Sequence, residues 1–87
     1  MINPYVFPIK GDISRADCVT LYEEGMKCQG IILEFGMGGS TIILGTTGNR
    51  IISYENEQIW IDKTQKNIDA YNCKLPKKMN IVLQKIS

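Results

Sequence analysis

Short runs of apolar, mostly β-branched residues alternate with glycine-rich or polar turns along most of the chain. Runs of this kind, recurring about every ten residues with turn signals between them, are typical of the strands of an all-β domain. In one run, Ile59 and Ile61 fall on one face and Trp60 on the other, as the two-residue period of a strand requires. The pattern predicts extended segments at residues 2–9, 18–22, 30–35, 41–45, 50–54, 58–62 and 79–86.

Two segments depart from simple strand chemistry. Pro4 and Pro8 have no backbone N–H to donate to a sheet, so we expect residues 1–9 to form an edge strand or an arm. Further along, Thr64 and Ile68 stand four residues apart, as on one face of a helix. The pattern therefore predicts one short helix near residues 63–72.

The segment Gly36–Ser40 holds three of the eight glycines and joins two predicted strands. We interpret it as the flexible tip of a hairpin, with Met37 exposed there. A nucleotide-binding loop would need a helix directly after it, and the P-loop form needs Lys followed by Ser or Thr. Because a strand is predicted after Ser40 and no such Lys is present, we do not expect nucleotide binding at this loop.

Composition favours the same fold class. Isoleucine is the most common residue, with 14 of 87, and there are only two alanines. β-branched side chains suit a pleated sheet, whereas helical chains usually lean on Ala and Leu. We therefore predict a mostly-β single domain over residues 1–87: a small antiparallel β-sandwich of the immunoglobulin-like type with one short helix. The pattern does not separate such a sandwich from a small barrel.

Little in the chain points to catalysis. It contains no histidine, which excludes His-based triads and HExxH metal sites. Cys18, Cys28 and Cys73 are odd in number and form no CxxC pair. We expect reduced thiols, with a Cys18–Cys28 bridge as the alternative. Lys27 stands next to Cys28, but adjacency in sequence does not establish that it activates the thiol.

The positions of the carboxylates in the sequence do not indicate catalysis either. The pairs Glu23–Glu24 and Glu55/Glu57 lie in predicted polar turns, where solvent reaches both members of each pair. Acid–base catalysis needs a pocket that separates the pKa values of two such groups. We therefore predict no enzyme activity, no catalytic or metal-binding residue and no cofactor.

The charge is nearly balanced overall but uneven along the chain. The formal net charge is +1, yet six lysines and one acidic residue, Asp69, stand from Lys63 onward. A basic end can meet phosphates or an acidic protein, although no aromatic residues are interleaved with these lysines for base stacking. Exposed aromatic, Met and Lys side chains are the best candidates for an interface. They are Tyr5, Phe7, Met37, Trp60, Lys77 and Lys78.

Several motifs stand in a recognisable order: an extended NPY…PIKGD start, a GIILEF strand, TIIL, GNRI, EQIWID, KTQKNIDAY and a closing MNIVLQKI. In this order they resemble the small immunoglobulin-like N-terminal domains of phage baseplate upper proteins and related tail modules. The family's T-x-x-x-I helix motif corresponds to Thr64 and Ile68, whereas the cysteines and the Lys77–Lys78 turn depart from its pattern. The resemblance implies a sandwich fold and a structural role, and it carries over no catalytic residue.

From these observations we expect a non-enzymatic assembly module that packs into a larger oligomeric particle. The particle would be a phage tail or baseplate, so the protein would lie in the virion after assembly in the host cytoplasm. Its partners would be other virion proteins and copies of itself. We do not expect nucleic acid as the main partner. Because no apolar run approaches the roughly 20 residues of a membrane span, we do not expect a membrane partner either. The alternative is a small inhibitor or regulator that binds a host protein or nucleic acid through its lysine-rich C-terminal third.

Overall fold

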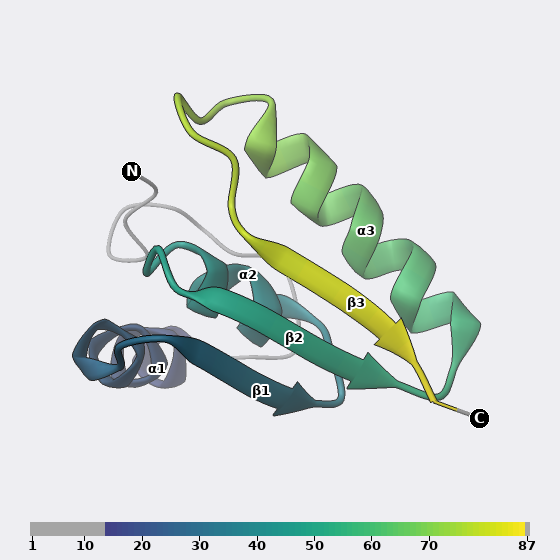
Figure 1. The fold of residues 1–87 in the computed structure, drawn as a ribbon, viewed down its shortest axis with the longest axis horizontal. Helices are drawn as coiled ribbons and strands as arrows, with labels where there is room; N and C mark the ends of the chain where they lie inside the picture. The colour runs from purple at the N-terminus through teal and green to yellow at the C-terminus, as the bar shows by residue number, and fades with distance from the viewer. Residues whose placement is uncertain (1–13, 87) are drawn as a thin grey trace.

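The computed structural model describes residues 14–86. In this range helices alternate with strands, and each later strand is reached through a helix (Figure 1). The elements are α1 (Arg15–Lys27), β1 (Ile31–Phe35), α2 (Gly39–Gly45), β2 (Arg50–Glu55), α3 (Gln58–Asn72) and β3 (Ile81–Lys85).

The strands form one sheet in the order β1-β2-β3, and both neighbouring pairs are parallel. Ile32 aligns with Ile51, which aligns in turn with Ile81. Parallel neighbours need a crossover connection, which α2 and α3 supply. All strands therefore end at one edge of the sheet, at the lower right of Figure 1, which we call the carboxyl edge. They begin at the opposite edge, the amino edge.

The helices cover one face of this sheet. In Figure 1, α1 and α2 lie behind β1 and β2 while α3 runs beside β3, and α2 contacts both other helices. Ile51 and Ser53 of β2 are fully buried, as are Ile42 and Ile43 of α2. A helix enclosed in this way is apolar around most of its surface, which is why its sequence has no clear polar face.

The other face of the sheet is open within residues 14–86. Ile31, Leu33 and Phe35 of β1 are 60%, 58% and 77% exposed. The Phe35 ring stacks on Tyr54 of β2, with the ring centroids 5.3 Å apart. Parallel sheets are normally covered on both faces, so this apolar stripe of β1 is unusual surface for a small α/β unit.

The predicted antiparallel β-sandwich of immunoglobulin-like type is wrong, because the chain is an α/β unit with parallel strands. The predicted strands at 30–35, 50–54 and 79–86 are confirmed as β1, β2 and β3. Those at 18–22, 41–45 and 58–62 are helical. The predicted helix at 63–72 is confirmed in type but is too short, because α3 begins at Gln58. The expected arm at 1–9 lies outside the described residues.

Burial explains why β-branched residues form helices here. Each such residue costs up to about 0.7 kcal/mol in a helix relative to Ala. Fully burying an Ile side chain returns about 1.5–3 kcal/mol, so the burial of Ile42 and Ile43 outweighs their poor helix propensity. At α1, the Ser14 hydroxyl accepts a hydrogen bond from the Asp17 N–H at 3.1 Å and so caps the start of the helix. This helix-start signal is easily overlooked, because the residues that follow have the composition of a strand.

None of the helices between residues 14 and 86 has the length and apolar character needed to cross a membrane.

Candidate functional site

The loop that connects β1 to α2 lies at the carboxyl edge and contains two glycines, Gly36 and Gly38. Gly36 has a φ of 81°, in the left-handed region that glycine adopts without strain. Its N–H donates to the Tyr54 carbonyl at 2.7 Å and so joins the start of the loop to the end of β2. Gly38 follows, and a Cβ added at either glycine would meet no atom of the described residues within 4 Å. Within residues 14–86, the space directly at these two glycines is therefore open.

Hydrogen bonds between the Glu34 carboxylate and nearby hydroxyl groups hold this loop in place. The Glu34 carboxylate accepts from Thr41 Oγ1 at 2.5 Å and Ser53 Oγ at 2.7 Å through Oε1, and from Ser40 Oγ at 2.5 Å through Oε2. Thr41 Oγ1 in turn accepts from the Gly38 N–H at 3.1 Å. Because β1, β2 and α2 all contribute to this network, it fixes the loop relative to the sheet.

A second carboxylate stands at the same edge. Glu55 is the last residue of β2, and it follows Gly36 by 19 residues. Its Oε2 accepts from the backbone N–H groups of Asn56 and Glu57 at 3.0 and 3.1 Å. These bonds orient the half-buried side chain at the turn into α3, one strand away from the glycine loop.

The arrangement has a known chemical use. In open parallel sheets, ligands bind beyond the carboxyl ends of the strands. A strand, a G-x-G turn, a helix and an acidic residue about 20 positions later form the dinucleotide-binding pattern, in which the acid takes the ribose hydroxyls. Here Gly36, Gly38 and Glu55 occupy those positions. The usual third small residue is replaced by Thr41, which is buried and bonded to Glu34.

The sequence analysis rejected a nucleotide loop for two reasons: no P-loop Lys is present, and a strand was expected after Ser40. The second reason was wrong, because the structure has the helix α2 there. The spacing from Gly36 to Glu55 was visible in the sequence, but it has meaning only when the two flanking strands are parallel neighbours. Met37 was expected at an exposed tip, and this was wrong, because the side chain is buried at 8% exposure.

The structure does not bring the remaining interface candidates together. Trp60 lies on α3, not on a strand, is 37% exposed and has the Lys63 ammonium 5.1 Å from its ring centroid. Lys77 and Lys78 are exposed in the loop between α3 and β3, at the amino edge. Tyr5 and Phe7 lie outside the described residues.

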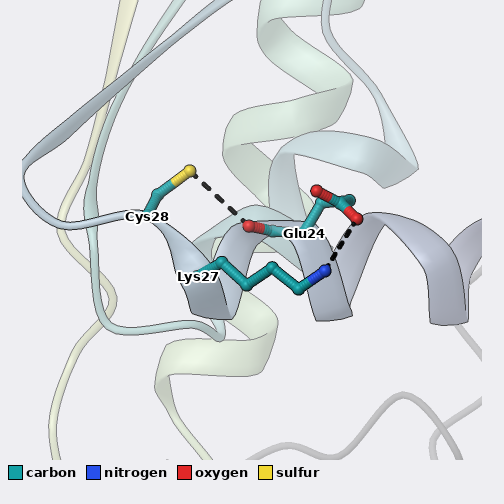
Figure 2. A network of polar contacts seen from close by, with 3 residues as sticks. All are labelled: Glu24, Lys27 and Cys28. Atoms are coloured by element: carbon teal, nitrogen blue, oxygen red, sulfur yellow. Dashed lines mark hydrogen bonds and ion pairs between the residues drawn. The ribbon is translucent and has the colours of Figure 1, made fainter.

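The cysteines form no reactive centre in the described part of the chain. Cys18, Cys28 and Cys73 form no disulfide among the described residues. Figure 2 shows that the Lys27 ammonium bonds to a Glu24 carboxylate oxygen at 3.2 Å, while Cys28 Sγ donates to the Glu24 carbonyl at 3.5 Å. The Lys27 charge is therefore paired with a carboxylate and not with the thiol. Among residues 14–86 no group of His, Cys, Asp or Glu is placed to hold a metal ion.

The fold and the site together define a parallel β-α-β unit with a glycine loop and an edge carboxylate. Comparison of the chain with protein families, with curated proteins and with solved structures found no match.

Proposed function

We propose that the carboxyl edge of this unit binds a nucleoside-containing cofactor, with the ribose hydroxyls on Glu55 and the 5′ side against the Gly36–Gly38 loop. The observation that carries the proposal is the placement of both features on adjacent parallel strands, joined by the Gly36 N–H to Tyr54 carbonyl bond. Because an ionised carboxylate can accept from both hydroxyls of a ribose, Glu55 suits this role.

The glycine at position 38 supports close approach of a ligand. Its φ of 167° is extended backbone that any residue adopts, and a Cβ there would touch no atom of residues 14–86. Neither backbone strain nor packing within the described residues requires glycine at this position. A ligand that lies against the loop backbone would require it, because a side chain would fill the space that the ligand uses.

The charges near the glycine loop restrict the chemical class of the ligand further. The segment from Gly36 to Thr41 has no Lys or Arg, and the Glu34 carboxylate bonds to the first turn of α2. The helix itself has seven residues, so its dipole is short. A pyrophosphate at this loop would meet the Glu34 charge, and the residues from Gly36 to Thr41 offer no cation to compensate it. These features favour a nucleoside whose 5′ substituent is neutral or cationic.

The test is a calorimetric titration of the protein with S-adenosylmethionine, whose 5′ substituent carries a sulfonium, and with NAD⁺ and ATP. We expect the sulfonium compound to bind best. Glu55→Gln should weaken its binding by about tenfold or more, since the exchange removes a charged acceptor. Gly38→Val should remove binding while leaving the thermal unfolding midpoint close to that of the wild type.

Glu57→Gln is the matched control, because Glu57 lies in the same turn and offers only its backbone N–H to Glu55. It should bind within about twofold of the wild type, as expected for a solvated surface charge. Equal affinity in the wild type and in Glu55→Gln, or tighter binding of ATP than of the sulfonium compound, would contradict the proposal.

The assembly role predicted from the sequence stays a prediction, and one observation favours its self-association part. Within residues 14–86, β1 is an edge strand with an exposed apolar stripe, and it has neither Lys nor Pro to block pairing. Antiparallel pairing with β1 of a second copy about Leu33 would set Ile31 opposite Phe35 and keep both stripes on one face. A virion as the particle rests on the resemblance alone.

Sedimentation velocity tests this prediction. The wild type should show a concentration-dependent dimer, and Leu33→Lys with Phe35→Lys should be monomeric, because two charges at the pairing axis repel. Lys substitutions at the exposed Gln65 and Asn67 of α3 add the same charge away from β1 and should leave the dimer intact. A wild-type monomer at every concentration would refute the prediction.

A further inference from the structure

A pocket of about 380 Å³ opens at the amino edge of the sheet, at the opposite end of the strands from the glycine loop. Two segments line it: the turn between α2 and β2, and the loop from Leu75 to Asn80 that leads into β3. Both segments lie toward the upper left of Figure 1. The volume is within the range of about 300–1,000 Å³ that small-molecule sites occupy.

Part of the lining of this pocket is apolar. Leu75, Pro76 and Met79 supply this part, together with Gly45 at the end of α2. A Cβ at Gly45 would lie 2.5 Å from Ile81 Cδ1 and 3.0 Å from Met79 Sδ, so glycine at this position lets the start of β3 pack directly on α2. Packing between the end of α2 and the start of β3 therefore holds this part of the lining in place.

The lining also carries positive charge, and the described lining residues include no acidic counterion for it. Lys77 and Lys78 both line the pocket, and no Asp or Glu is among the lining residues that the structure describes. The ion pair found within residues 14–86 joins Lys27 to Glu24 and does not involve Lys77 or Lys78. Lys77 and Lys78 are the only cationic residues among the described lining residues. The Thr46 hydroxyl already donates to the Ile43 carbonyl at 2.7 Å.

We propose that this pocket binds a small phosphate monoester with a short apolar group, the phosphate on Lys77 and Lys78 and the apolar group on Leu75 and Met79. Lysine ammonium groups bind phosphate as compact point charges, and an apolar substituent gains free energy by leaving water to contact the apolar lining residues. This site is separate from the proposed nucleoside site at the carboxyl edge and does not depend on it.

The test uses hexyl phosphate as the probe, with hexanol and inorganic phosphate as its two halves, in an amide NMR titration. We expect hexyl phosphate to bind at least about tenfold more tightly than either half, since both the lysines and the apolar lining residues contribute. Shifts should concentrate at residues 45–48 and 75–80. The double variant Lys77→Gln/Lys78→Gln should weaken hexyl phosphate binding by about tenfold.

Lys66→Gln/Lys85→Gln is the control, because it removes the same net charge from residues that do not line the pocket. It should bind hexyl phosphate within about twofold of the wild type. The proposal is overturned if the lysine double variant binds like the wild type, or if inorganic phosphate binds as tightly as hexyl phosphate. Binding to anionic lipid vesicles or to nucleic acid, with no hexyl phosphate binding, would overturn it as well.

Discussion

Replacing Ile51 with alanine is expected to lower the free energy of unfolding by about 2–5 kcal/mol, the range for truncating a large buried aliphatic side chain. Ile51 is fully buried in the central strand, where it aligns with Ile32 and Ile81 and faces the helices. Small domains have a total stability of roughly 5–15 kcal/mol, so this loss is a large part of it. Urea denaturation followed by circular dichroism measures it.

The matched control for this change is Ile31→Ala. Ile31 is also a strand isoleucine, but it is 60% exposed on the open face of the sheet. Its truncation should change the free energy of unfolding by no more than about 0.5 kcal/mol, as for most surface substitutions. Similar losses at both positions would show that the open face is covered in solution and would contradict the one-sided packing described above.

Replacing Glu34 with alanine is expected to cost about 2–4 kcal/mol. The carboxylate accepts from the hydroxyls of Ser40, Thr41 and Ser53, and the last two residues are fully buried. Without Glu34 these two hydroxyls lose their acceptor in a place that water reaches poorly, and each orphaned group costs about 1–3 kcal/mol. Thermal unfolding should therefore shift strongly to lower temperature.

Glu34→Gln tests whether hydrogen bonding is the cause. The glutamine carbonyl oxygen can still accept from two hydroxyls, so this variant should be clearly more stable than Glu34→Ala and less stable than the wild type. Ser53→Ala in the Glu34→Ala background should recover part of the loss, because it removes one orphaned donor. If Glu34→Ala unfolds like the wild type, the network does not hold the loop.

The amino-acid pattern predicted some elements correctly for a local reason. Ile31–Phe35, Arg50–Glu55 and Ile81–Lys85 are short β-rich runs bounded by turn residues, and each forms a strand. The type of the helix around Thr64 and Ile68 was also correct, since both residues are buried on its inner face. These signals depend on residues close together in sequence.

Other elements could not be assigned locally. Thr41–Gly45 has the composition of a strand, and it is helical because it is enclosed by β2, α1 and α3. The candidate site has the same origin. In the sequence alone, Gly38 and Glu55 look like ordinary turn residues. The parallel pairing of β1 with β2 brings the ends of both strands, and with them these two residues, to one edge of the sheet.

The sequence by itself determined the absence of histidine chemistry, the near-neutral charge, the three strands and the glycine spacing. The tertiary structure alone decided that the strands are parallel, that helices cover one face, and that the carboxyl edge has a glycine loop beside a carboxylate. The physical reason is that burial free energy depends on which distant segments meet. This term exceeds the small local preferences of residues such as Ile42 and Ile43.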